Sequence, residues 1–251
     1  MFRTGKFLSS SRSFKGKATF FWSWKLKQVE GVNMKKVIAT TMAAFLVAQV
    51  ASAVSATVDF ASAYVFRGTT FNDGFVVQPG LEGEVKGFTV GVWANIDVDE
   101  VPGNDESVSE IDLYLGYGLG SVAGWDLSAG YCEYTYPGAE GNGESEVSLS
   151  AAGAISGVDV SVTAYANVAV SATPNFYEIS TGGSTSLAGV ALDYGIDAGF
   201  FDGDDSGLGY AAYSVSYETG GGTLSVSYVD ELDDELVVVD ESVIIAYGIS
   251  L

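Results

Sequence analysis

The sequence predicts an all-β protein, an antiparallel transmembrane β-barrel of about twelve strands, and three observations lead to this fold class. From residue 58 to the end, apolar and polar residues alternate in runs of about ten, as in Val158 to Val168, and this period of two is typical of strands with one apolar and one polar face. The charged residues fall almost entirely on the polar face. The mean hydropathy is +0.25, yet no run after residue 54 approaches the roughly 18 apolar residues of a transmembrane helix. Apolar surface spread over many strands is typical of a lipid-facing barrel.

The segment before the predicted barrel has the order of a secretory signal peptide. Met34-Lys35-Lys36 is a short basic start, Val37 to Val50 is apolar, and Ala51-Ser52-Ala53 is a small-residue cleavage signal. We therefore interpret 34–53 as a signal peptide and expect cleavage after Ala53 or after Ala56.

Residues 1–33 are basic, aromatic and serine-rich, and they have no place in front of a signal peptide. We interpret them as a non-native upstream extension, with Met34 as the true start. An extended signal region and a transit peptide are the alternatives. The predicted barrel domain is 54–251.

The alternation divides the barrel domain into twelve predicted strands. Pro79 interrupts the second strand and removes a ladder donor, so we expect a bulge there. Thr181-Gly182-Gly183-Ser184 interrupts the alternation near the eighth strand. The predicted strands are 57–67, 75–85, 88–97, 108–119, 125–135, 146–154, 158–168, 176–182, 189–201, 208–219, 223–230 and 242–251.

The connections between these strands alternate in kind. One set is tight and nearly uncharged, as hairpin turns are: Lys86-Gly87, Gly120 to Gly124, Ser156-Gly157 and Gly220-Gly221-Gly222. The other set is longer and acidic: 98–107, 137–145, 202–205 and 230–235. Short turns at one end and long loops at the other are the layout of an outer-membrane barrel.

The apolar face of each strand is predicted to point outward. Val58, Phe60, Tyr64 and Phe66 form this face in the first strand, and Tyr64, Trp125, Tyr217 and Tyr247 lie where interfacial aromatic girdles are found. The alternative is a soluble β-sandwich in which these side chains form a core. The signal peptide, and an inner face rich in Gly, Ala and Ser, favour the barrel.

The charge of the barrel domain is strongly negative. Of the 11 basic residues only Arg67 and Lys86 lie after residue 53, against 31 acidic ones, which gives 54–251 a net charge of −29. No basic patch is present to neutralise phosphates, which excludes nucleic acid as a partner. A proteome adapted to salt water would produce the same acidity without any functional meaning.

The polar face is predicted to line the lumen with carboxylates. Bare charges are too costly to bury in a dry interior, so this face must contact water or cations. The candidate lumen-lining residues are Arg67, Glu82, Glu84, Asp97, Glu110, Asp112, Asp159, Asp193, Asp197 and Glu218, with Asp59, Asp126, Glu146 and Glu178 on the same face. A plug made of the barrel's own side chains is the alternative to a narrow pore, because twelve strands lie between filled and open barrels.

Catalytic and metal chemistry have few candidate residues. The chain has no histidine and one cysteine, Cys132, which removes histidine-dependent nucleophilic catalysis and ordinary zinc sites. We expect no enzyme and no cofactor. Asp202, Asp204 and Asp205 have part of the spacing of a calcium loop but lack the downstream Glu. A solvated loop is one interpretation, and weak Ca²⁺ or Mg²⁺ binding or bridging to lipopolysaccharide is the other.

Three stretches near the start of the barrel carry a family resemblance. Ser62-Ala63-Tyr64-Val65-Phe66-Arg67-Gly68, Gln78-Pro79-Gly80-Leu81 and Lys86 to Asn95 resemble the TorF-like family of bacterial outer-membrane porins. The resemblance covers about 57–97. It implies an outer-membrane barrel and a channel role, but no solute and no site residues. Leu251 departs from the terminal aromatic residue common in outer-membrane barrels.

Two functions follow as expectations. The first is a passive porin of the Gram-negative outer membrane, transporting small solutes with a cation preference set by the acidic lumen. The second is a non-channel barrel, an adhesin or envelope-stabilising protein that acts through its acidic loops. Both have outer-membrane lipid and lipopolysaccharide as partners, and neither fixes an oligomeric state.

Overall fold

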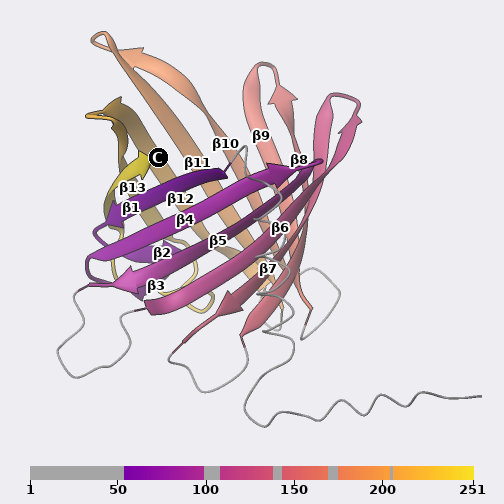
Figure 1. The fold of residues 1–251 in the computed structure, drawn as a ribbon, viewed down its shortest axis with the longest axis horizontal. Helices are drawn as coiled ribbons and strands as arrows, with labels where there is room; N and C mark the ends of the chain where they lie inside the picture. The colour runs from indigo at the N-terminus through magenta and orange to yellow at the C-terminus, as the bar shows by residue number, and fades with distance from the viewer. Residues whose placement is uncertain (1–53, 99–107, 138–142, 169–174, 204–205) are drawn as a thin grey trace, which may run out of the picture.

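Twelve strands close into an antiparallel barrel in the computed structural model, which describes residues 54–98, 108–137, 143–168, 175–203 and 206–251 (Figure 1). This confirms the predicted fold class. The first strand pairs with both its sequence neighbour in the wall and the last strand, so the sheet has no free edge. The wall strands are β1 (Val54–Ala61), β4 (Val76–Val85), β5 (Phe88–Asp97), β6 (Val108–Val122), β7 (Trp125–Thr135), β8 (Glu144–Ile155), β9 (Val158–Asn167), β10 (Phe176–Leu187), β11 (Val190–Asp202), β12 (Ser206–Thr219), β13 (Gly222–Glu231) and β14 (Val243–Ser250).

The described residues contain no helix long and apolar enough to cross a membrane. The predicted signal peptide (34–53) and the predicted upstream extension (1–33) lie outside the described residues, and both stay predictions.

Each predicted strand corresponds to a wall strand, but three details were wrong. The first predicted strand, 57–67, ends at Ala61 in the wall. β10 continues through Thr181-Gly182-Gly183-Ser184 to Leu187, because glycines in a strand still pair through their backbone. No residue is inserted at Pro79: the β4–β5 register is the same on both sides, at Val77↔Ile96 and Gly80↔Trp93.

Tight turns close the barrel wall at one end, which we name the short-turn end. Lys86-Gly87, Ala123-Gly124, Ser156-Gly157 and Ala188-Gly189 each have two successive positive φ angles. This conformation makes a two-residue turn whose twist matches a β-hairpin, and glycine adopts it without strain. The β8–β9 and β10–β11 turns lie at the top of Figure 1. The opposite end is the long-loop end.

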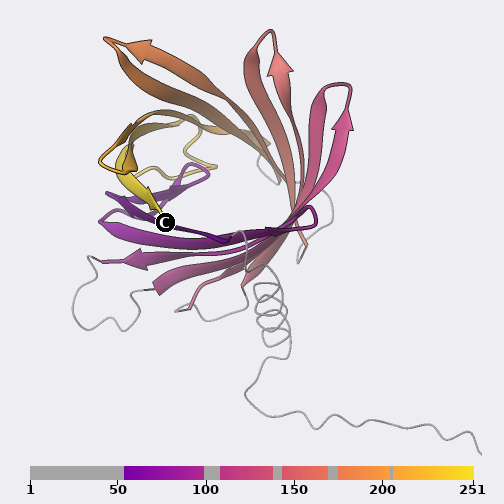
Figure 2. The same cartoon turned by 45° about the horizontal axis from the view of Figure 1, so that its top comes forward.

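The hairpins spread apart at the short-turn end. β9 and β10 pair only as far as Asp159↔Gly182, whereas β10 and β11 stay paired to Leu187↔Val190. Figure 2 shows that the ends of the β6–β7, β8–β9 and β10–β11 hairpins are separated from one another. The wall is therefore continuous in its long-loop half and divided at its short-turn end.

A short hairpin folds from the wall into the barrel interior. β2 (Tyr64–Phe66) and β3 (Thr69–Asn72) pair with each other and are not part of the closed ring. We name residues 64–72 the inner hairpin. Its tip contacts β8 and β12, which lie four strands from β4 and three strands from β1 around the ring. The predicted outward positions of Tyr64 and Phe66 were therefore wrong, because the chain leaves the wall at Ser62.

The outer face of the wall is an apolar belt. Leu149 on β8 is 57 % exposed, and Ile179 on β10 and Ile245 on β14 are also exposed. Trp125, Tyr217 and Tyr247 lie on this face according to the strand register. Large apolar side chains that meet no other part of the protein are typical of a surface in contact with lipid.

Candidate functional site

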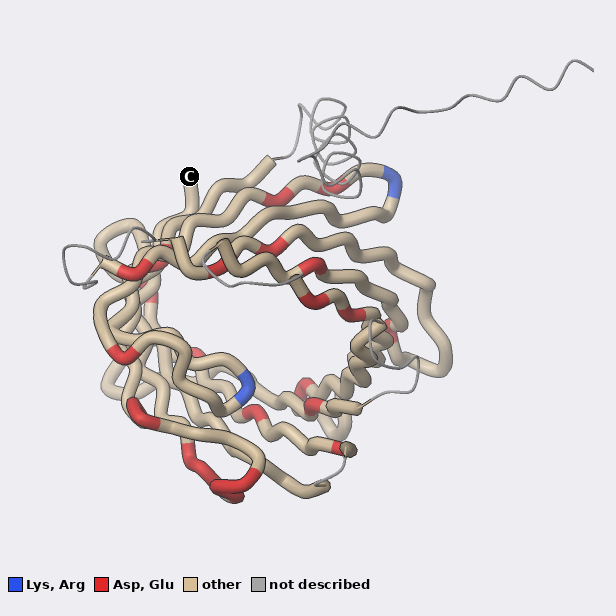
Figure 3. The backbone as a smooth tube through the Cα atoms, turned by 90° about the horizontal axis from the view of Figure 1, so that it is seen from below, with Lys and Arg blue, Asp and Glu red and all other residues tan. Residues whose placement is uncertain are grey.

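The strand register places the candidate carboxylates on one face of the wall, opposite to the apolar belt. Partners in an antiparallel ladder share a face, and the pairs Trp93↔Asp112 and Asn95↔Glu110 extend this face from β5 to β6. Figure 3 shows acidic positions around the whole ring. The residues of this inner face include Glu82, Glu84, Asp97, Glu110, Asp112, Asp159, Asp193, Asp197 and Glu218, together with Asp59, Asp126, Glu146 and Glu178.

Toward the short-turn end, the inner carboxylates have neutral partners. Thr223 donates a hydrogen bond to Glu218 at 2.7 Å, Ser184 donates to Asp193, and Ser121 donates to Asp126. Tyr114 extends across Gly91 and donates to Glu82 at 2.9 Å. A hydroxyl donor carries no charge, so these hydrogen bonds leave the negative charge of the carboxylates in the lumen unbalanced.

In the long-loop half, the inner hairpin covers the carboxylates. Glu110 is 2 % exposed and accepts a hydrogen bond from Tyr64 of the inner hairpin. The neighbouring Asp112 has a buried Oδ1 without a partner among the described residues. Asp97 accepts a hydrogen bond from Asn72 at 2.8 Å. The same wall chemistry is therefore solvated at one end and covered at the other.

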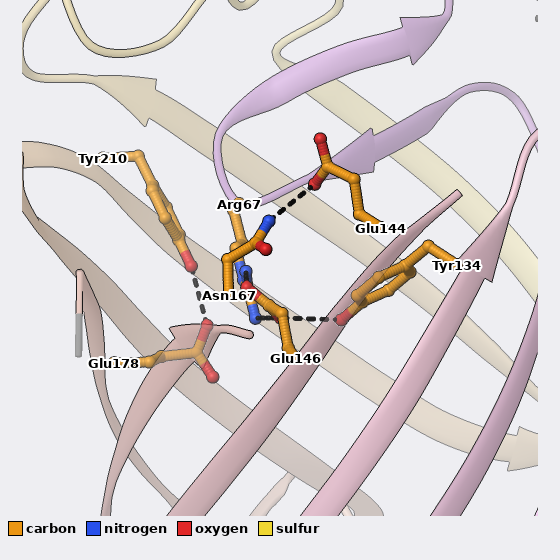
Figure 4. A network of polar contacts seen from close by, with 7 residues as sticks. All are labelled: Arg67, Tyr134, Glu144, Glu146, Asn167, Glu178 and Tyr210. Carbon is orange, nitrogen blue, oxygen red and sulfur yellow. Dashed lines mark hydrogen bonds and ion pairs between the residues drawn. The ribbon is translucent and has the colours of Figure 1, made fainter. Parts of the chain in front are cut away.

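Arg67 at the tip of the inner hairpin makes the central contact. Its Nη1 and Nη2 atoms donate to the two carboxylate oxygens of Glu146, each at 2.9 Å, and Tyr134 donates to the same carboxylate at 2.9 Å. The guanidinium carbon lies 4.2 Å from the ring centroid of Tyr165 and 4.3 Å from that of Phe176. Figure 4 shows Arg67 reaching from the inner hairpin to Glu146.

Two opposing effects act on this guanidinium. Desolvation by burial lowers the pKa of Arg67, while its hydrogen bonds and Coulomb attraction to Glu146 raise it, and the net direction is upward. The group is thus charged, and its bidentate pairing is the strong form of a carboxylate contact. Arg67 adopts a φ of 49° and Gly68 one of 77°, the same turn geometry that closes the wall hairpins.

The tip has close contacts on a second side. A Cβ atom on Gly68 would lie 2.7 Å from Cβ of Tyr210 on β12, so only glycine fits there. Tyr210 in turn donates to Glu178 at 2.7 Å. Figure 4 shows this pair on the other side of Arg67 from Tyr134. The hairpin tip is therefore held between two tyrosine–carboxylate pairs.

A buried amide network holds the base of the inner hairpin. Asn95 on β5 is 0 % exposed. Its Nδ2 donates to Asn72 at 2.6 Å and to Ser109 at 2.8 Å, and its Oδ1 accepts from Gln78 at 2.9 Å. Ser109 is available because the β5–β6 register shifts between Asn95 and Ile96, which leaves one extra residue on β6.

The segment 232–242, between β13 and β14, contacts the second strand of the inner hairpin. Thr70 donates its backbone N–H to the carbonyl of Val238 at 2.9 Å, and its hydroxyl accepts from the backbone N–H of Asp240 at 3.0 Å. Val237 is 2 % exposed and packs with Phe176, Tyr210 and Val229. Together the inner hairpin and this segment pack apolar side chains into the long-loop half of the interior.

Cavities remain beside the tip and at the short-turn end. Arg67, Glu178, Asp197 and Tyr210 line a cavity of about 280 Å³. Glu146, Tyr165, Cys132 and Tyr114 line another of about 240 Å³. A larger one of about 500 Å³ lies at the short-turn end and includes Asp126 and Asp159. The Arg67–Glu146 contact thus has water-sized space on both sides.

The predicted divalent loop lies only partly within the described residues. Asp202 ends β11 and accepts a long contact from Ser206 at 3.5 Å, whereas Asp204 and Asp205 lie outside the described residues. Within the described ranges, no group of three Cys, Asp or Glu side chains is placed to hold a metal ion. Weak Ca²⁺ or Mg²⁺ binding at this loop stays a prediction.

Sequence reasoning missed the partners of Arg67. It placed Arg67 among the lumen-lining residues of the acidic face, but it did not identify Glu146 as the paired carboxylate or Asn95 as the anchor of the hairpin base. One signal was available: Arg67-Gly68 has the same form as Lys86-Gly87, which was recognised as a turn.

Comparisons with known proteins give one family match and several distant structural likenesses. Residues 47–160 match the Gcw_chp family model, described as a bacterial protein of unknown function. No curated protein matches the sequence. A solved structure titled as the KdgM porin in complex with disordered oligogalacturonate has a TM-score of 0.47 and 9 % identity, covering 79 % of this chain and 97 % of its own.

Two further solved structures show a similar degree of likeness. The COG4313 outer membrane channel from Pseudomonas putida F1 has a TM-score of 0.43 and 13 % identity, covering 79 % of this chain and 95 % of its own. The Salmonella typhi outer membrane phospholipase dimer with bound calcium has a TM-score of 0.44 and 12 % identity, covering 78 % of this chain and 89 % of its own. At these values, the likeness says nothing about function.

Proposed function

We propose that the protein is an outer-membrane porin, a passive channel for small solutes, and that its acidic lumen favours cations. The observation that carries this proposal is the division of charge between the two faces of the wall. The inner face bears the carboxylates named above, whereas Arg67 is the one basic side chain that contacts it in the described part of the chain, and Glu146 already pairs with it. A negatively lined passage concentrates cations and repels anions.

The outer face supports an outer-membrane location. An apolar belt around a closed barrel suits contact with lipid, and short turns at one end with long loops at the other are the arrangement of barrels of the Gram-negative outer membrane. The resemblance of residues 57–97 to TorF-like porins supports the same assignment. Fractionation of the envelope on a sucrose gradient tests it, and recovery in the soluble fraction would contradict it.

Planar-bilayer recording tests the channel. Under a KCl gradient we expect a reversal potential of the sign that cation selectivity produces. The triple variant Asp159→Asn, Asp193→Asn and Glu218→Gln removes three charges in the solvated half of the lumen, and it should bring the K⁺/Cl⁻ permeability ratio closer to 1.

The matched control for this test is Glu133→Gln. Glu133 pairs in register with Leu113 and Ser145 on the outer face of the wall, so its neutralisation should leave selectivity unchanged. Absence of conductance, or a preference for anions, would overturn the proposal.

A non-channel barrel, an adhesin or envelope-stabilising protein, is the second candidate, because the inner hairpin and segment 232–242 fill the long-loop half of the interior. One observation would distinguish this candidate from the porin: the wild-type barrel never conducts, whereas a variant without the inner hairpin does. That outcome would assign the closed barrel a role at its acidic loops, where binding of lipopolysaccharide vesicles in the presence of Mg²⁺ can be measured.

A further inference from the structure

The contacts of Arg67 form a complete recognition site for a guanidinium group. Glu146 receives both donor nitrogens in a bidentate arrangement, and Tyr134 fixes one of its oxygens. The rings of Tyr165 and Phe176 lie within 4.3 Å of the guanidinium carbon. A planar cation with forked donors satisfies the carboxylate and the aromatic faces at the same time, which a spherical ammonium does not.

The wall strands supply this site, and the inner hairpin supplies the guanidinium. Tyr134, Glu146, Tyr165 and Phe176 belong to β7, β8, β9 and β10, whereas Arg67 belongs to the inner hairpin, which lies outside the closed ladder. A two-stranded hairpin is marginally stable by itself. Contacts with the wall and with segment 232–242 therefore hold it in place, and the Arg67–Glu146 contact is the ion pair at its tip.

We propose that Glu146, Tyr165 and Phe176 form a binding site for guanidinium-bearing solutes, and that Arg67 occupies this site as an internal, competing ligand. A solute reaches it from the cavities on either side, since Arg67 lines one and Glu146 and Tyr165 line the other. Binding of the solute releases the hairpin tip. Binding of the solute does not require that the barrel conducts. If the barrel is a channel, release of the hairpin tip by the solute would open it.

Arg67→Gly vacates the site with little backbone strain, because glycine accepts the φ of 49° found at this position. The probe is ethylguanidinium at low millimolar concentration, added to the detergent-solubilised barrel. Its binding is measured by isothermal titration calorimetry and by the thermal unfolding midpoint followed with circular dichroism.

The expected result is saturable binding to Arg67→Gly, with a raised unfolding midpoint and at least about tenfold weaker binding once Glu146→Gln is added, as for removal of one partner of a buried charge pair. Ethylammonium should bind Arg67→Gly more weakly than ethylguanidinium. Wild type should show weaker binding than Arg67→Gly, because its own arginine fills the site. Arg67→Asn, which also tolerates a positive φ, serves as a second vacated variant.

Equal binding to Arg67→Gly and to the double variant would overturn the proposal, as would absence of binding to both vacated variants. Bilayer conductance of the same proteins separates this result from the channel proposal. If the solute binds but no variant conducts, the binding site stands and the porin proposal is wrong. If the barrel conducts but the solute does not bind, the porin proposal stands and the binding site is wrong.

Discussion

The two halves of the barrel interior have the same wall but different contents. At the long-loop end, the inner hairpin and segment 232–242 pack against aromatic side chains, and residues as polar as Asn95 and Glu110 are buried. At the short-turn end, carboxylates lie among Ser, Thr and Gly beside a cavity of about 500 Å³. The difference shows that strand patterning creates an acidic inner face, and that one short inserted hairpin decides where this face meets water.

Energetically, the two halves respond differently to substitution. A solvated carboxylate with a hydroxyl partner contributes little to stability, as exposed polar pairs do. Removal of either partner of a buried carboxylate–arginine pair lowers the stability of the fold strongly, because it leaves an uncompensated buried charge. The following predictions test this contrast, from the largest expected effect to the smallest.

Replacement of the inner hairpin, residues 64–72, by a short Gly-Ser linker should change the protein most. The closed ladder does not include the hairpin, so the barrel should still assemble, while the long-loop half loses its filling. We expect a severalfold rise in single-channel conductance in planar bilayers. Retention of the heat-modifiable mobility of a folded barrel on electrophoresis is the control, and an unchanged conductance would show that the hairpin does not limit the passage.

Glu146→Gln should have the next largest effect. It leaves the Arg67 guanidinium in the same buried position without its carboxylate, which for a buried pair costs about 3–5 kcal/mol. We expect frequent transitions to a higher conductance level and a lower unfolding midpoint. The matched substitution at the short-turn end is Asp126→Asn, whose partner is the hydroxyl of Ser121; an equal effect of both would remove the contrast between the halves.

Asn95→Ala should weaken the base of the inner hairpin without removing a charge. It deletes hydrogen bonds to Asn72, Ser109 and Gln78 and leaves buried polar partners unsatisfied, at about 1–3 kcal/mol. The measurement is hydrogen exchange of the 64–72 backbone, which should become faster. Unchanged protection there would show that the tip alone holds the hairpin.

Lys86→Asn should have the smallest effect. Lys86 has a φ of 52° in the β4–β5 turn, a conformation that Asn tolerates well, and surface substitutions of this kind usually change stability by less than about 0.5 kcal/mol. Unfolding midpoint and conductance should both match wild type. A clear loss of either would reveal a role for this basic turn that its position does not indicate.

Much of the wall could be predicted from the sequence because a strand in a lipid-facing barrel meets two constant environments. Val158 to Val168 alternates as expected for a strand with lipid on one side and the interior on the other, and Lys86-Gly87 and Ser156-Gly157 mark turns because two positive φ angles favour glycine. The candidate carboxylates could be assigned to one face for the same reason.

The inner hairpin could not be predicted in this way. Tyr64, Val65 and Phe66 follow Ala61 with no change in composition, and an apolar residue on the outer wall has the same pattern as one packed against an internal cluster. The partners of Arg67 and Asn95 lie 79 and 14–23 residues away in the chain, so their pairing depends on how the ring closes.

The sequence by itself determined the strands, their two faces, most of the tight turns and the acidic character of the lumen, because these depend on neighbours one or two residues apart. The tertiary structure alone decided that residues 64–72 leave the wall and that Arg67 meets Glu146 beside the neighbouring rings of Tyr165 and Phe176. Those contacts join elements on opposite sides of a closed ring, and their distances follow from the ring closure and strand register rather than from any local pattern.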